Sequence, residues 1–216
     1  MERKTISIPL AQNPKIAIKV IPGHFITSSA HISHYLDVST LKTNSIVARD
    51  VARELAFPYL STTLVDTIVC IENTRVIGAY LAEELLQNGR YVINRGGDIN
   101  VITPRSNTLG QLTFYDSEIG WVTNKNILLL VATISSGKTV NRTLECLEYY
   151  GGKLVGISAL FLASPKEMET NINYLFTSED IPGYNVYRAS ECEMCKKGQE
   201  VDAIVSNEGY NKMKRT

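Results

Sequence analysis

The stretch ILLLVATISSGKTVNRTLECLEYYGG, residues 127–152, predicts a buried strand, a loop of small residues and a helix. In the helix, Val140, Leu144 and Leu147 recur at helical spacing, and Gly151 is a typical C-terminal stop. Small residues let the backbone turn so that several N–H groups point at one anion, and the N-terminus of the helix adds positive charge. The stretch therefore predicts a phosphate cradle, with a plain strand-to-helix turn as the alternative.

Apolar segments of strand length alternate with helical patterns on both sides of this stretch. Strands are expected at 16–21, 63–72, 91–94, 127–131 and 153–162, and helices at 45–55 and 76–89. In the first helix, Ile46, Val47, Val51 and Leu55 are expected to face the core. Residues 95–120 lack periodicity and predict a long mobile loop, with a hairpin as the alternative. Such alternation predicts an α/β fold with a mostly parallel central sheet and helices on both faces.

Composition limits the classes of partner. The chain has 216 residues, and its 22 Lys and Arg residues equal its 22 Asp and Glu residues. Without an overall positive field, neither nucleic acid nor an anionic membrane is an expected partner. We find no apolar run of membrane-helix length and no signal-peptide pattern at the N-terminus, so a cytoplasmic location is expected.

One interpretation of the loop is a nucleoside triphosphate P-loop. The segment ATISSGKT, residues 132–139, places Lys138 where it would reach the outer phosphates and Thr139 where it would hold magnesium. However, more than half of the chain precedes it, and no later strand ends in Asp to complete a magnesium site.

A second interpretation rests on resemblance to the type I phosphoribosyltransferases, in which an apolar strand leads to a Thr-Thr-Gly-Gly-Thr type loop and a helix. Ser135–Thr139 resemble that loop, and three further stretches match in the same chain order. FITSSAHISHYLD (25–37) resembles the base-binding segment, DTIVCIENTRVIGAYLAEEL (66–85) the pyrophosphate loop, and CEMCKKGQEVDAIVSNEG (192–209) a Cys-x-x-Cys-x-x-Gly tail. Together they most resemble the orotate branch of the family.

The resemblance implies a role for each matched residue. The phosphate would bind Thr133, Ser135, Ser136, Gly137, Lys138 and Thr139; pyrophosphate would lie near Asn73, Thr74 and Arg75; the base would contact Ser28, His31 and Tyr35; and Arg105 would be the catalytic residue of the mobile loop. It also implies phosphoribosyl diphosphate as ligand, a homodimer, and a single domain, 1–216, with a core at about 45–165 and a hood from 1–44 and 166–216. Magnesium is the implied cofactor.

Two departures from the family pattern affect catalysis. The acidic pair that would grip the ribose hydroxyls, and help to organise magnesium, aligns with Val131 and Ala132. The mobile loop has neither the Lys nor the His that the family brings over the leaving pyrophosphate. A geometry in which Glu72, Asp66 or Asp37 replaces the missing acids remains an alternative.

Three functions therefore stay open. The first is transfer of a phosphoribosyl group to orotate or a related base, with weak or altered activity. The second is binding of a nucleotide or sugar phosphate without turnover, and the third is the P-loop function.

Histidines and cysteines supply two weaker signals. His24, His31 and His34 lie close in sequence to Asp37, but a base-pocket or surface role is favoured over metal binding, and no metal ligand is assigned. Cys192 and Cys195 form a lone Cys-x-x-Cys, which is interpreted as a turn, because the other two cysteines, Cys70 and Cys146, lie in predicted core elements.

Overall fold

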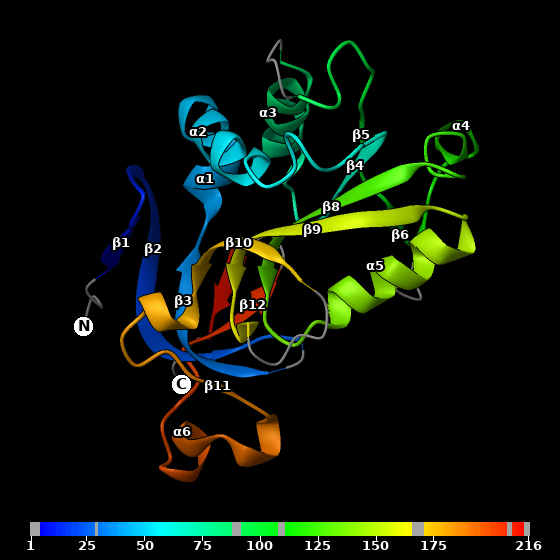
Figure 1. Ribbon diagram of the computed structural model, residues 1–216. Helices are drawn as coiled ribbons and strands as arrows, with labels where there is room; N and C mark the ends of the chain where they lie inside the picture. The colour runs from blue at the N-terminus through cyan, green and yellow to red at the C-terminus, as the bar shows by residue number, and fades with distance from the viewer. Residues whose placement is uncertain are drawn as a thin grey trace.

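The computed structural model describes residues 5–28, 30–87, 92–107, 111–165, 171–206 and 209–213. Its centre is a five-stranded parallel sheet with the strand order β10-β9-β8-β4-β5, where β4 is Thr67–Cys70, β5 Asn100–Ile102, β8 Asn126–Ile134, β9 Lys153–Leu162 and β10 Asn173–Thr177. Helices cover both faces of this sheet (Figure 1). The α/β class predicted from the sequence is therefore confirmed.

Strand β8 shows why the two faces are both apolar. Leu128, Leu130 and Ala132 belong to the core under α2 (Ser45–Ala56) and α3 (Arg75–Leu86). Leu129 and Val131 belong to the core under α5 (Lys138–Tyr149). Successive side chains of a strand point to opposite faces, so a strand buried on both sides needs a continuous apolar run. ILLLV meets that need.

A second sheet joins the two ends of the chain. It contains β1 (Ile6–Leu10), β2 (Asn13–Ile26), β3 (His31–Asp37), β11 (Val186–Tyr187), β12 (Ala203–Ser206) and β13 (Gly209–Lys212). Strand β12 runs parallel to the end of β2, which brings the C-terminal strands beside the N-terminal hairpin. In Figure 1 this sheet lies at the lower left, and β3 leads upward into α1 (Ser39–Thr43) and then α2.

Short elements complete the described chain. They are the β6 (Arg105–Ser106) and β7 (Leu112–Thr113) hairpin, α4 (Asp116–Ile119), two 3-10 turns at Ser178–Asp180 and Ala189–Glu191, and α6 (Glu193–Lys196). No helix among the described ranges is both long enough and apolar enough to cross a membrane.

Several predicted elements need correction. Residues 95–120 contain the hairpin given as the alternative, β6–β7, but also a core strand, β5, and α4, so they are not one long loop. Residues 92–94 form no strand; Asn94 instead bonds the backbone of Val65 and Thr63, while Tyr91 lies outside the described residues. In α2, Ile46 is 75% exposed, and Ala48 and Ala52 fill the buried face beside Val51 and Leu55. Alanine is only weakly hydrophobic, so Ala48 and Ala52 do not mark the buried face in the sequence.

Candidate functional site

The strand order places a binding site at one edge of the parallel sheet. The first strand of this sheet in chain order, β4, lies between β5 and β8. The chain adds β5 on one side of β4 and later strands on the other side, so the strand order reverses between β4 and β8. In open α/β sheets, ligands bind at the carboxyl ends of the strands where the order reverses. The loops after β4 and β8 indeed line a cavity of about 820 Å³.

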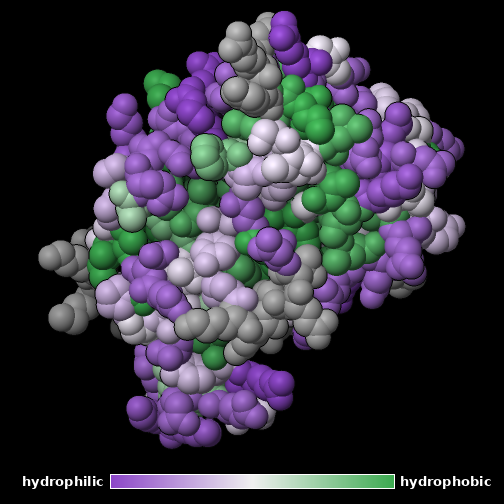
Figure 2. All heavy atoms as spheres, in the orientation of Figure 1, coloured by the Kyte–Doolittle hydropathy of each residue, from purple (hydrophilic) through white to green (hydrophobic). Residues whose placement is uncertain are grey.

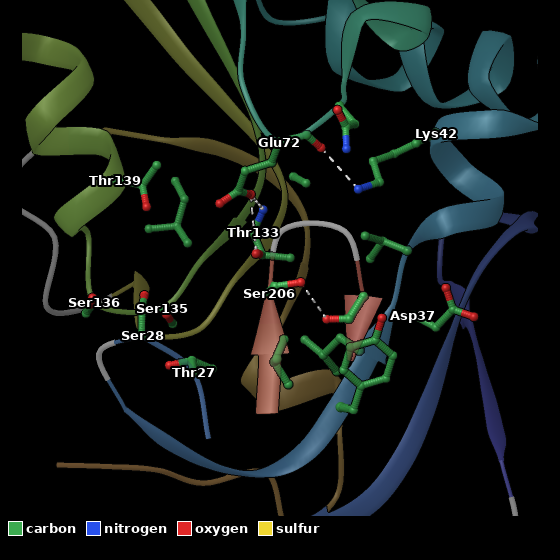
Figure 3. Close-up of a pocket in the computed structure, with 18 of the residues that line it drawn as sticks. Thr27, Ser28, Asp37, Lys42, Glu72, Thr133, Ser135, Ser136, Thr139 and Ser206 are labelled. Atoms are coloured by element: carbon green, nitrogen blue, oxygen red, sulfur yellow. Dashed lines mark hydrogen bonds between the residues drawn. The ribbon is translucent and has the colours of Figure 1, made fainter. Parts of the chain in front are cut away.

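Five segments of the chain meet around this cavity (Figure 3). They are the loop after β4 (Glu72 and Asn73), the end of β8 with the start of α5 (132–140 and Arg142), the end of β3 with α1 (35–39, Lys42 and Thr43), the β2–β3 loop (Thr27 and Ser28), and the C-terminal strands (Val205, Ser206 and Gly209). Its charged lining consists of three basic and two acidic side chains.

The predicted phosphate cradle is built at the N-terminus of α5. Strand β8 continues through Ile134, and the chain turns over residues 135–137 before α5 begins at Lys138. Gly137 has φ 72°, a left-handed conformation that glycine adopts without steric cost. Ser135–Thr139 all line the cavity. The first turn of α5 therefore opens toward the cavity with N–H groups that have no partner within the helix.

The same backbone does not fit the P-loop interpretation. Residues 132–134 of ATISSGKT are paired strand residues, as Thr133 and Ile134 face Phe161 and Leu162 of β9. Three residues of turn remain, whereas a P-loop wraps its phosphates with the longer segment between its two glycines. The loop therefore provides an anion site built on a shorter turn than that of a P-loop.

Glu72 reaches across from the end of β4 to the end of β8. Its Oε2 accepts the backbone N–H of Thr133 at 2.9 Å, and the Thr133 hydroxyl lies 3.4 Å away. Glu72 and Asn73 have φ of 56° and 62°, a left-handed conformation that is costly for Glu and better tolerated by Asn. Lys42 Nζ donates to the Glu72 carbonyl at 3.0 Å and supports this turn. A carboxylate thus stands beside Ala132, where the sequence itself has no acid.

Burial sets the protonation of this pair of groups. Desolvation raises the pKa of Glu72, while the Thr133 amide and the Lys42 ammonium act against that rise. Desolvation likewise lowers the pKa of Lys42, against the opposing charges of Glu72 and Asp37. The two groups therefore stabilise each other's charged forms at the cavity wall.

The raised pKa of Glu72 predicts a pH-dependent stability. Folding favours the protonated acid, so its contribution is complete below the ordinary value of 4.5 and is lost as pH rises through the folded-state pKa. Glu72→Gln removes this loss, and its stability relative to the parent chain should increase from about pH 4 to about pH 7. Urea unfolding of the variant and the parent chain at both pH values measures the difference between their free energies of unfolding. Glu145→Gln, on the exposed side of α5, is the matched control; a difference that is constant with pH would contradict the expectation.

The other acids considered as replacements behave differently. Asp37 lines the cavity, and its Oδ1 accepts the backbone N–H of Ser39 at 2.9 Å. Asp66 lies at the opposite end of β4, where its Oδ2 accepts the N–H of Asn126 at 2.7 Å. Glu72 and Asp37 therefore lie at the site, and Asp66 does not.

The remaining sequence-predicted residues divide between the cavity and other places. Ser28, Tyr35, Asn73 and Thr133 line the cavity, whereas Thr74 is buried and its hydroxyl donates to the Ile71 and Leu130 carbonyls. Arg75, His31 and Arg105 do not belong to the described lining.

Two of these displaced residues have clear partners. The guanidinium of Arg105 pairs with Glu118 at 3.0 Å and lies over the Tyr115 ring. His31 faces His24 and Cys195 instead of the cavity. Lys42, which sequence reasoning missed, lies on a five-residue helix with no motif of its own, so only the fold brings it to the site.

Comparisons with known proteins bear on the fold. No family model matches the chain, and no curated protein matches it. Among solved structures, the UMP synthase of Leishmania donovani matches with a TM-score of 0.55 and 18% identity over 88% of this chain, which spans 37% of that protein. A phosphoribosyltransferase from Corynebacterium diphtheriae matches with a TM-score of 0.50 and 15% identity, over 75% of this chain and 90% of that one. The chain therefore has the fold of the type I phosphoribosyltransferases.

Proposed function

We propose that this chain binds a 5-phosphoribosyl compound, with phosphoribosyl diphosphate as its ligand, and that any transfer to a pyrimidine-type base such as orotate is weak or altered. The observation that carries the proposal is the cradle at the start of α5, opening into the cavity at the carboxyl ends of β4 and β8. Cavities of this size suit a ligand of nucleotide dimensions.

The lining suggests how such a ligand would lie. Its 5′-phosphate would accept hydrogen bonds from backbone N–H groups of Ser135–Thr139. Lys42 and Lys138 would supply positive charge. Glu72 would accept ribose hydroxyls in place of the missing acidic pair. Tyr35, packed edge-on against Tyr210 at 4.7 Å, would give the base an aromatic contact. Desolvation, then Asp37 and Tyr210, raise the pKa of Tyr35, so its hydroxyl stays a neutral donor.

Magnesium is part of this proposal in a reduced form. Mg²⁺ is usually held by one or two carboxylates together with substrate phosphates. The cavity offers Glu72 and Asp37, each already accepting protein hydrogen bonds, and Val131 and Ala132 cannot ligate through their side chains. The residues therefore fit a metal held chiefly by the ligand's own phosphates.

Binding without turnover is the second candidate, and two observations favour it. Val131 is fully buried in the core, so no acid could act from that position without a change of packing. Arg105 is engaged by Glu118 and Tyr115 within its own hairpin region. The first feature removes an acid that would grip the ribose hydroxyls and help to organise magnesium, and the second removes a cation that would stabilise a departing pyrophosphate. The homodimer and the cytoplasmic location remain expectations within the same proposal.

Calorimetric titration tests the proposal. Phosphoribosyl diphosphate should bind with micromolar affinity, more tightly with magnesium, and ATP should not compete. Release of pyrophosphate on addition of orotate would assign transfer, and tight binding with no release would assign the binding function. Absence of any binding of phosphoribosyl diphosphate, with or without magnesium, would refute both.

A further inference from the structure

Two histidines and two cysteines from distant parts of the chain meet outside the cavity. His24 lies in β2, His31 begins β3, and Cys192 and Cys195 flank the start of α6. One ligand atom from each lies within 4.8 Å of every other. His24 and Cys192 are buried, His31 is half-buried and Cys195 is exposed. The sequence shows no motif that joins the four residues, because about 160 residues separate the two histidines from the two cysteines.

Four of the six distances between these atoms are close to the edges of a tetrahedron around an ion. Zinc–sulfur and zinc–nitrogen bonds of about 2.3 and 2.0–2.1 Å give tetrahedral edges of about 3.3–3.8 Å. His24 Nε2 lies 3.6 Å from both Sγ atoms, His31 Nδ1 lies 3.3 Å from Cys195 Sγ, and the two ring nitrogens are 3.0 Å apart. These four edges match the tetrahedral values to within a few tenths of an ångström, and all six lie within 4.8 Å.

A backbone contact orients the first histidine for metal binding. His24 Nδ1 lies 2.9 Å from the Gln199 carbonyl oxygen. Because a carbonyl only accepts, Nδ1 carries the proton, and the lone pair of the neutral ring is on Nε2, which points into the cluster. Metal-binding histidines commonly donate their other N–H to such a carbonyl.

The C-terminal segment between β11 and β12 has few buried side chains of its own. From residue 182 to residue 202 only Cys192 is buried, and Figure 2 shows mainly hydrophilic side chains over the small lobe around α6 at the bottom of the view. One end is held by two hydrogen bonds: the His24 N–H donates to the Asp202 carboxylate, and the Asp202 N–H donates to the His24 carbonyl. Segments without a hydrophobic core are typically stabilised by a disulfide or a structural metal.

We propose that His24, His31, Cys192 and Cys195 bind a structural zinc ion. Two thiolates and two imidazoles in a closed tetrahedral set are characteristic of structural Zn²⁺, with no position left for a reacting water. The ion fastens the C-terminal segment to the β2–β3 hairpin. His24 and His31 also flank the loop that carries Thr27 and Ser28, so the ion holds one wall of the cavity in place.

Zinc content and cobalt spectroscopy of the untagged full chain test this site. After reduction, addition of equimolar zinc and extensive dialysis, we expect one zinc ion per chain by mass spectrometry. Cobalt in its place should give the d–d bands of a tetrahedral ion and a thiolate charge-transfer band. Cys195→Ser, at an exposed position, should retain at least about tenfold less zinc after the same dialysis, while Cys146→Ser, at a buried thiol elsewhere, should retain as much as the parent chain.

A second readout separates this site from the proposed function. Chelation should lower the melting temperature of the parent chain and of Cys146→Ser, and have little effect on Cys195→Ser. A zinc-free parent chain after zinc addition, a Cys192–Cys195 disulfide in that reduced sample, or equal zinc content in Cys195→Ser would each overturn the proposal. None of these measurements depends on phosphoribosyl binding.

Discussion

Ser136→Asp is expected to weaken the binding of phosphoribosyl diphosphate by about 100-fold or more, without loss of the fold. Ser136 lies in the turn between β8 and α5, it is exposed, and it lines the cavity. A carboxylate there would face the 5′-phosphate across the N–H groups of the cradle. Like charges placed together in an interface cost several kcal/mol, and the carboxylate would itself accept the N–H groups that the phosphate needs.

Calorimetric titration of the variant measures this effect, and Ser117→Asp is its matched control. Ser117 is also exposed, lies in the first turn of α4 outside the described lining, and undergoes the same change of charge. It should bind phosphoribosyl diphosphate like the parent chain. Unchanged affinity in Ser136→Asp would show that the phosphate does not lie in this turn, even if the cavity binds the ligand elsewhere.

The central sheet could be predicted from the sequence because its strands carry a strong local signal. ILLLV and TIVC are continuous apolar runs, as burial on two faces requires, and Gly151 adopts the left-handed φ of 72° expected after a helix. Strand β5 was missed because its three residues, NVI, are too few to show any period. It forms because β4 offers it an unpaired edge, a tertiary cause that no local window contains.

The residues of the candidate site also differ in whether the local sequence predicts them. The Ser135–Thr139 cradle is contiguous in sequence, so its residues could be named before the structure. Glu72 was considered as a replacement acid, but only the pairing of β4 with β8 shows it bonded to Thr133. The motif predicts that His31 contacts the base, whereas in the fold His31 meets Cys195, which the return of β12 alongside β2 brings to it. Long-range contacts of this kind leave no local pattern.

Val131→Asp is expected to destabilise the fold by about 3–5 kcal/mol, because it buries a carboxylate without a partner. Val131 is fully buried, pairs with Ala159 of β9 and packs in the core under α5. A typical domain has about 5–15 kcal/mol of stability, so much of the protein would unfold at neutral pH. Val131→Thr, of similar shape but uncharged, should cost less, about 1–3 kcal/mol.

The pH dependence of unfolding identifies the cause. A buried Asp has a raised folded-state pKa, so the penalty is absent below its unfolded pKa of about 3.9 and grows as pH rises above it. Urea unfolding of Val131→Asp should therefore approach that of Val131→Thr in acid and fall far below it at neutral pH. If Val131→Asp were as stable as Val131→Thr at neutral pH, the position could carry an acid. Val131 would then be a residue that an acid can replace, and not a necessary part of the core on which α5 packs.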